Sequence, residues 1–260
     1  MGDLPVVFPD YESWSFPGGA VLAHRSVVAP VREALSQRRT LYEWAAHQAS
    51  RDVFTGRGEA YGVQLGGTRA VVRHARRGGA LARLLGDRYL GAPRFVREID
   101  TAQRLARAGV PTPAVLAGVR YPAGLVHRAD VATERVDGTD LVTLFFSPTP
   151  PRGGIRTAIF HAVGALVRRL HNAGFVHPDL HLRNVLIELS SSAALPPYRP
   201  AAWLLDVDTC RVTGPEDDAP RRANLARFER SWRKWNATRG PHLAEDDFAA
   251  VMDGYHGKPA

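Results

Sequence analysis

The run HPDLHLRNVLI, from His177 to Ile187, limits the possible folds of this chain more than any other segment. Asp179 and Asn184 stand five residues apart in it, and an apolar run, Val185 to Ile187, follows at once. A loop with this spacing is typical of phosphoryl transfer, where the Asp lies beside the acceptor hydroxyl and the Asn binds Mg²⁺. Ordinary polar turns also produce isolated matches, because an Asp side chain can bond its own backbone. The neighbouring segments therefore have to decide between the two interpretations.

Those neighbouring segments favour a catalytic loop. Apolar residues between Ile155 and Ala173 recur with the spacing of one helix face, and Gly174 follows as a helix C-cap residue would. After the loop, a second apolar segment, Trp203 to Leu205, ends at Asp206. The expected order is helix, polar loop, strand, strand and Asp, as in the catalytic lobe of a protein-kinase-like fold. Asp206 is then expected to bind the metal together with Asn184.

A glycine-rich hairpin is expected in the N-terminal half. Gly56 and Gly58 precede two alternating segments, Tyr61 to Leu65 and Thr68 to His74, which Gly66–Gly67 joins as a two-residue turn. This resembles the hairpin that covers the ATP phosphates in kinases, so Gly56 and Gly58 are candidate nucleotide-binding residues. Glycines at hairpin ends more often only form the turn, and this assignment depends on the catalytic loop downstream.

The residue expected to bind the phosphates is an arginine. The sequence has only two lysines, Lys234 and Lys258, both near its C-terminus. In AVVRHARRGG, Arg73 stands where kinases with the V-A-I-K pattern carry a lysine, and its planar guanidinium can bind phosphate through two N–H groups. The helix expected from Arg94 to Ala108 offers Glu98 as the ion-pair partner. The alternative is that both residues are solvated surface charges.

The order of these strings resembles a known family. The strings that carry the resemblance, from about Phe54 to Lys234, are VVRHARRGG, GDRYLG, RFVREIDTAQRLARAGVPTPAVLAG, YPAGLVHRADVATERVDGTDL, HNAGFVHPDLHLRNVLI, WLLDVDTC and NLARFERSWRKW. The chain is similar to the lipopolysaccharide kinases, specifically to the 3-deoxy-D-manno-octulosonic acid (Kdo) kinases. That family usually reads H-A-D-L-N in the catalytic loop and I-D-F-D at the metal strand. This chain departs from it with Pro178, with His181 in place of the Asn, and with LDVD at residues 205–208.

The resemblance implies an α+β, two-lobed protein-kinase-like fold with a small β-rich N-lobe and a helical C-lobe. We expect an N-terminal extension over residues 1–50, the N-lobe over 51–135 and the C-lobe over 136–260, with a hinge at 136–138. One chain of 260 residues with 45% hydrophobic residues is long enough for such a unit. An amphipathic stretch, Val31 to Ala49, lies in the extension, and its role does not follow from the sequence.

The resemblance also implies ATP and Mg²⁺ as cofactors and the Kdo sugar of a lipid A precursor as acceptor. Asp179 is expected to be the catalytic residue; Gly56, Gly58, Arg73, Glu98, Asn184 and Asp206 are expected to bind the nucleotide, the last two through the metal. The residues alone indicate only a hydroxyl on a non-protein molecule. The alternatives are a kinase of a core heptose or of another small hydroxylated acceptor such as an aminoglycoside, and an inactive kinase-like binding module.

The formal charge of +8 raises the question of an anionic partner, for which nucleic acid and an anionic membrane are the two candidates. No nucleic-acid motif is present, so we expect no nucleic acid, and no obligate protein partner is evident. An anionic glycolipid and peripheral contact with an anionic membrane are expected. The resemblance implies that this membrane is the inner membrane of a Gram-negative bacterium, contacted at its cytoplasmic face. The candidate basic residues are Arg221, Arg222, Arg227, Arg230, Arg233 and Lys234, although the same segment can be a core-packing helix with a solvated face. We expect no membrane span and no secretory leader, and the single cysteine, Cys210, excludes an intramolecular disulfide.

Overall fold

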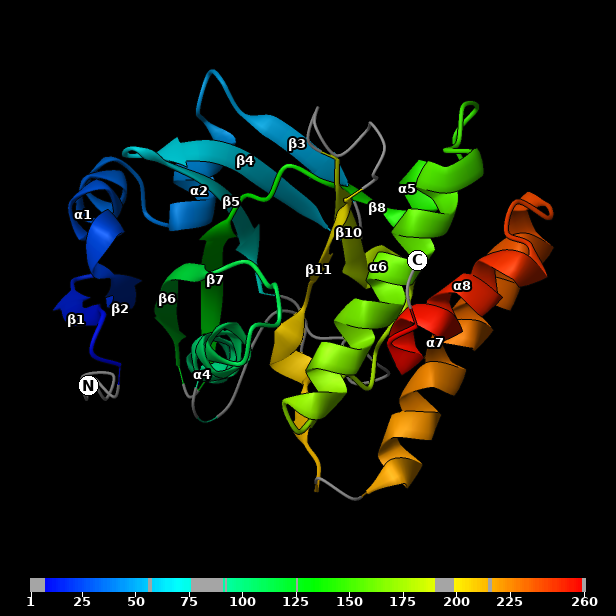
Figure 1. Ribbon diagram of the computed structural model, residues 1–260. Coiled ribbons are helices and arrows are strands. Elements are labelled where there is room, and N and C mark those ends of the chain that lie inside the picture. Colours follow the sequence, from blue (N-terminus) through cyan, green and yellow to red (C-terminus); the bar gives the residue numbers. More distant parts are fainter. Residues whose placement is uncertain are drawn as a thin grey trace. The chain divides into compact units, whose positions relative to one another are not determined.

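The computed structural model describes residues 8–55, 58–75, 91, 93–124, 126–189, 199–214 and 217–258 (Figure 1). Gly56, one of the expected nucleotide-binding residues, lies outside these ranges, as do Arg76, Arg77 and most of the segment between Glu188 and Ala201. The chain divides into two compact units. Unit 1 comprises residues 1–100 and 114–135, and unit 2 comprises residues 101–113 and 136–260.

Unit 1 is built on an antiparallel sheet, which has seven strands in the described residues, in the order β1-β2-β6-β7-β5-β4-β3. The strands are β1 (Tyr11–Phe16), β2 (Gly19–His24), β3 (Asp52–Thr55), β4 (Glu59–Leu65), β5 (Thr68–His74), β6 (Val115–Ala123) and β7 (Val126–Glu134). The helical segments are η1 (Arg25–Val27), α1 (Val28–Gln37), α2 (Leu41–Ala46) and α4 (Arg94–Arg107), the last of which runs on into unit 2. This sheet accounts for the β-rich small lobe that the sequence predicts.

The hairpin predicted around Gly66–Gly67 is confirmed. β4 and β5 pair antiparallel with Leu65 opposite Thr68, and Gly66 has φ 64°, which a residue with a Cβ rarely adopts. The register places Arg73 opposite Ala60, which follows Gly58 by two residues.

Residues 8–50 belong to the sheet unit. β1 and β2 are two of its strands, and the stretch Val31 to Ala49 forms two helices, α1 and α2, rather than one amphipathic segment. The break falls where Arg38 is extended and the Thr40 hydroxyl accepts a hydrogen bond from Glu43 N as the N-cap of α2. From the sequence we expected an extension over residues 1–50, separate from the small lobe, because the apolar residues of this region do not reveal which sheet they cover.

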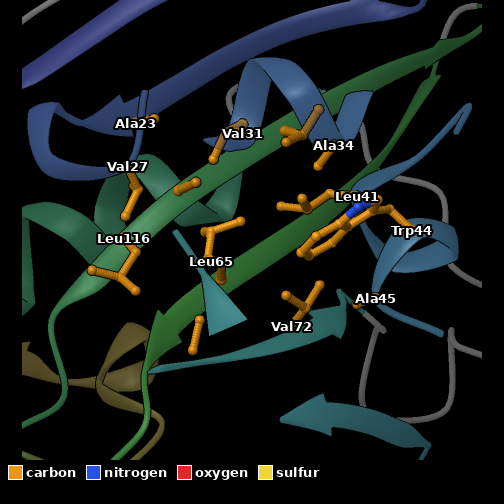
Figure 2. Packing of buried hydrophobic residues seen from close by; sticks show 14 of the residues in the cluster. Ala23, Val27, Val31, Ala34, Leu41, Trp44, Ala45, Leu65, Val72 and Leu116 are labelled. Atoms are coloured by element: carbon orange, nitrogen blue, oxygen red, sulfur yellow. The ribbon is translucent and has the colours of Figure 1, made fainter. Parts of the chain in front are cut away.

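The helices α1 and α2 cover one face of the sheet and close its main core. Figure 2 shows Val31, Leu41 and Trp44 packed toward Leu65 and Val72 of the sheet, and all five side chains are buried. The burial of such apolar side chains is the dominant stabilising contribution to folding.

A buried carboxylate connects α2 to the sheet. Asp130 on β7 is fully buried and accepts hydrogen bonds from Tyr42 N and Tyr121 Oη, both at 2.9 Å, while His74 Nδ1 lies 2.6 Å from its other oxygen. Burial and the charge of Asp130 raise the pKa of the Tyr121 phenol well above its usual value. Tyr121 Oη in turn accepts from Leu41 N at 2.8 Å.

Close packing on a glycine fixes the start of α4. A Cβ at Gly118 of β6 would lie 2.2 Å from the Phe95 ring, so only glycine allows this approach. Phe95 and Ile99 are buried, and Glu98 is 5% exposed on the same helix. The strand glycine therefore determines how deeply Glu98 is set.

Unit 2 is mainly helical. Its helices are α5 (Leu141–Phe145), α6 (Gly153–Asn172), α7 (Asp218–Arg239) and α8 (Glu245–His256), with the short turns η2 (Leu182–Asn184) and η3 (Val207–Thr209). The strands are β8 (Thr139–Asp140), β10 (Val185–Glu188) and β11 (Ala201–Leu204) in one sheet and β9 (Phe175–Val176) with β12 (Arg211–Val212) in another. The predicted helix before the loop and the two strands after it are confirmed.

Two glycines let α6 and α8 meet at backbone distance (Figure 1). A Cβ at Gly164 would lie 1.9 Å from Val251 O, and a Cβ at Gly254 would lie 2.0 Å from His161 O. Arg156 of α6 adds a bidentate pair to Asp247 of α8, with both nitrogen–oxygen distances at 2.6 Å. None of the helices among the described residues is both long and apolar enough to span a bilayer.

Candidate active site

The predicted catalytic loop begins at His177, directly after β9, and its first residue is fixed from two sides. The His177 side chain is fully buried, and its Nε2 lies 2.9 Å from Leu205 O. Its backbone N–H donates to Asn224 Oδ1 at 3.1 Å, and its carbonyl accepts from Asn224 Nδ2 at 2.5 Å. A single amide on α7 thus satisfies both backbone groups of His177.

Asp179 is the predicted catalytic residue, and its side chain is 35% exposed. Arg227 Nη2 donates to Asp179 Oδ1 at 2.6 Å, and His181 Nε2 lies 3.6 Å from Asp179 Oδ2. The Asp179 carbonyl accepts from Asn184 Nδ2 at 3.0 Å. The Asp179 carboxylate is therefore partly exposed to solvent, while Arg227 contacts its side chain and Asn184 bonds its backbone carbonyl.

His181 stands where the related loops usually carry Asn. Burial is the main cause that lowers its pKa from 6.5, and the Asp179 carboxylate partly offsets this. The imidazole is therefore neutral at pH 7, and its contact with Asp179 is not an ion pair under those conditions.

The strand pairing brings the two predicted metal ligands to the same end of one hairpin-like pair. β10 and β11 pair antiparallel with Val185 opposite Leu204, and Leu205 N donates to Asn184 O at 2.9 Å. Asp206 follows immediately. Because Nδ2 of Asn184 is used for the Asp179 carbonyl, its amide oxygen is the atom suited to bind a cation.

Asp206 has an unusual backbone. Its φ of 53° and ψ of 44° are left-handed, and it is the non-glycine residue with positive φ within the described ranges. Such a conformation costs about 1 kcal/mol or more and is concentrated at functional sites. Its side chain is exposed, and Asp208, two residues on, is partly buried in η3. The described residues contain no cluster of three His, Cys, Asp or Glu side chains that could bind a metal without help from a substrate.

In unit 1, the predicted pair of Arg73 and Glu98 is formed. Arg73 Nη2 lies 2.6 Å from Glu98 Oε1, with the two side chains 30% and 7% exposed. Gly58 lies just before β4 and is partly buried, and Gly56 lies outside the described residues. The site residues predicted from the sequence are thus divided between the units, with Gly58, Arg73 and Glu98 in unit 1 and Asp179, Asn184 and Asp206 in unit 2.

Two residues of α7 were missed as parts of this site. Asn224 was not noticed in the sequence, and Arg227 was counted among the exposed basic residues, whereas its guanidinium contacts Asp179. Arg221 is also turned inward, with Nη2 3.3 Å from His171 O. The available signal was periodic, because Asn224, Arg227 and Ser231 follow one helix face, but nothing local indicated that this face meets residues 177–182.

Comparison with known proteins shows that the chain is similar to a single family of kinases. Residues 43–255 match the model of the lipopolysaccharide kinase (Kdo/WaaP) family. The 3-deoxy-D-manno-octulosonic acid kinase of Vibrio vulnificus strain YJ016 is 30% identical over 217 residues, covering 82% of this chain and 85% of that protein. The kinase of the same name from Vibrio parahaemolyticus serotype O3:K6 is 32% identical over 204 residues, covering 76% and 79%.

A solved structure has the same fold. The structure of WaaP in complex with acyl carrier protein aligns with a TM-score of 0.55, covering 88% of this chain and 87% of that chain at 19% identity. The likeness supports the kinase-like architecture described for the two units.

Proposed function

Because this chain belongs to the lipopolysaccharide kinase (Kdo/WaaP) family and is therefore a phosphotransferase, we propose that it transfers the γ-phosphate of ATP to a hydroxyl of the Kdo sugar in a lipid A precursor. The observation that carries the proposal is the geometry of the loop. Its Asp179 side chain is partly exposed, and the Asp179 carbonyl accepts a hydrogen bond from the Asn184 side chain. The pairing of β10 with β11 brings Asn184 next to Leu205, which directly precedes Asp206.

Asp179 acts on the acceptor. Its carboxylate orients the hydroxyl and accepts its proton as the acceptor oxygen forms a bond to the γ-phosphorus. The bond between that phosphorus and the β–γ bridging oxygen breaks, and ADP leaves with the electron pair. Since the transition state is loose, the protein contributes mainly position and charge, which explains why the loop is held by so many hydrogen bonds.

The residues present fit Mg²⁺. A carboxylate and an amide oxygen are hard oxygen ligands, and Mg²⁺ in kinases completes its shell with waters and substrate phosphates rather than with a full protein cage. Asp206 and the amide oxygen of Asn184 would bind it, and the ion would neutralise charge on the β- and γ-phosphates.

Arg73 is proposed to bind the ATP phosphates. Its charge is permanent, and the bond to Glu98 at 2.6 Å holds its guanidinium on the β5 side of α4. Gly56 and Gly58 are proposed to bring backbone N–H groups to the same phosphates, as glycines permit.

The acceptor and the membrane are both anionic. On α7, Arg222 and Arg233 keep side chains that are 72% and 77% exposed, and each basic residue near an anionic surface contributes about 1 kcal/mol. We therefore propose peripheral association with the cytoplasmic face of the inner membrane of a Gram-negative bacterium. Release from anionic vesicles as salt rises from low to physiological concentration checks this, because such attraction is screened.

The test of the function is an acceptor panel. Purified protein, ATP and Mg²⁺ are incubated with Kdo-bearing lipid A precursor, heptosylated core and an aminoglycoside, and phosphate transfer is measured for each. Transfer to the Kdo-bearing lipid alone supports the proposal, whereas transfer to heptose or to the aminoglycoside replaces the acceptor, and transfer to none indicates an inactive module. The panel is run with and without acyl carrier protein, because WaaP was solved in complex with that protein. We expect no obligate protein partner, so transfer should not depend on its presence.

A further inference from the structure

The contact between Arg227 and Asp179 places a permanent positive charge on the carboxylate that meets the acceptor. The Nη2–Oδ1 distance is 2.6 Å, and the two residues are 48 apart in the chain, so α7 has to be in place for the contact to form. Both side chains are partly open, at 38% and 35% exposure. A molecule that reaches Asp179 can therefore also reach Arg227.

Arg227 belongs to a row of contacts that runs along the catalytic loop. Asn224, Arg227, Ser231 and Trp235 are spaced as i, i+3, i+7 and i+11, which is one face of a helix. Asn224 bonds the backbone of His177, the Ser231 hydroxyl accepts from Leu182 N at 3.3 Å, and Trp235 lies under the Arg183 guanidinium at 5.1 Å. The helix thus holds the loop at four successive points.

Arg227 differs from the other members of this row in what it contacts. Asn224 and Ser231 are 3% and 6% exposed and bond backbone groups, which is a task of support. Arg227 contacts the reactive carboxylate itself and is open to solvent. Support alone does not require a guanidinium there, since one hydrogen bond from a neutral amide would orient Asp179 as well.

A guanidinium has five N–H donors in a planar fork, so one Nη2 contact to Asp179 is compatible with a second anion on the same group. Such an anion, carried by the acceptor next to its reacting hydroxyl, would also bind Arg227. The interaction between Arg227 and the Asp179 carboxylate would then be weaker. A neutral sugar cannot do this, and a cationic acceptor would be repelled by Arg227.

We propose that Arg227 recognises a carboxylate on the acceptor and so selects sugar acids over neutral and cationic sugars. This rests on the proposed function, in which Kdo, itself a sugar acid, is the acceptor. Arg227 is then the residue that determines acceptor specificity, whereas a neutral donor at the same place is sufficient to orient Asp179.

The experiment compares Kdo-bearing lipid A precursor in detergent with the same acceptor after conversion of the Kdo carboxylate to its methyl ester. The proteins are the wild type, Arg227→Gln, Arg227→Lys and Arg107→Gln. Arg107 is an exposed residue of α4 that bonds only weakly to Gln103, at 3.4 Å, so its substitution is the matched control for loss of one positive charge. Thermal unfolding and nucleotide binding verify that each variant is folded.

The wild type and the Arg107→Gln control should lose about tenfold to a hundredfold in kcat/KM on the ester, the range for a lost hydrogen bond between charged groups. Arg227→Gln should lose a similar factor on the natural acceptor and lose little more on the ester, because the two changes remove one interaction. Arg227→Lys should recover part of the discrimination as a point charge.

Equal rates of the wild type on acid and ester would overturn the proposal while leaving the kinase function intact. So would an Arg227→Gln variant that loses the same factor on both acceptors relative to wild type, since that is the behaviour of a residue that only positions Asp179. Absence of transfer by the wild type to any sugar would instead contradict the proposed function itself.

Discussion

Asn224 supports the catalytic loop, and its replacement by alanine gives the most quantitative prediction from the contacts. The amide is 3% exposed and bonds the N–H and the carbonyl of His177, and its Oδ1 also lies 3.1 Å from His171 Nε2. Each buried polar group left without a partner costs about 1–3 kcal/mol, so Asn224→Ala should lower the free energy of unfolding by about 2–5 kcal/mol. His177 is two residues from Asp179, so we also expect kcat to fall by about tenfold or more, with a smaller change in the KM for ATP.

The same helix offers a matched control. Asn236 makes the same two bonds to another residue, with Nδ2 2.6 Å from Leu243 O and Leu243 N 3.0 Å from Oδ1, at the connection between α7 and α8. Asn236→Ala should lower the stability by about 1–2 kcal/mol, because its site is more exposed, and should leave kcat unchanged.

Urea unfolding followed by tryptophan fluorescence and steady-state kinetics below the unfolding temperature measure both effects. Equal losses of kcat in the two variants would mean that activity follows stability alone and that Asn224 does not position the loop. A wild-type free energy of unfolding for Asn224→Ala would refute the assignment of its hydrogen bonds.

Three further predictions concern other parts of the molecule. Arg73→Ala should raise the KM for ATP and lower kcat together, Arg73→Lys should restore part of the activity, and Glu98→Ala should add little in the double variant because the pair acts as one unit; additive losses in these kinetics contradict the pairing at 2.6 Å. Asp206→Ala should raise the Mg²⁺ concentration needed for half-maximal activity, and an unchanged metal titration would assign the ligand to another residue, with Asp208 the nearest carboxylate in sequence. Burial is the main cause that lowers the pKa of His171 from 6.5, so the unfolded chain binds this proton more readily than the folded chain. The contribution of the neutral His171 to stability is therefore fully present above about pH 6.5 and declines as the pH falls below it. In urea unfolding, His171→Gln should flatten this part of the curve of stability against pH.

The parts of the fold that the sequence predicted are those with local signals. The β4–β5 hairpin, α6 and the β10–β11 pair follow from a glycine turn, a helical repeat with a C-cap glycine, and short apolar runs. The pair of Arg73 and Glu98 followed from a motif register carried over from kinases. In each case a few neighbouring residues contained the information.

The parts that were missed depend on long-range contacts. β2 joins the sheet by pairing with β6, about a hundred residues later, and β1 joins it by pairing with β2. No local pattern specifies β6 as the partner. Arg227 reads as one more basic residue of an amphipathic helix, since only the docking of α7 on residues 177–183 turns it toward Asp179. The left-handed backbone of Asp206 was likewise not predictable, because this conformation is uncommon for residues other than glycine and nothing in the neighbouring sequence marks which Asp adopts it.

The most direct measurement of the central claim is the transfer of ³²P from [γ-³²P]ATP to Kdo-bearing lipid A precursor by the wild type and by Asp179→Asn, with nucleotide binding measured in parallel. The account predicts that the wild type labels the Kdo residue and that Asp179→Asn binds ATP nearly as well but loses turnover. Retention of more than about a tenth of the wild-type kcat, which corresponds to less than about 1.4 kcal/mol of barrier, would contradict the role of Asp179, and label on another part of the lipid would contradict the acceptor.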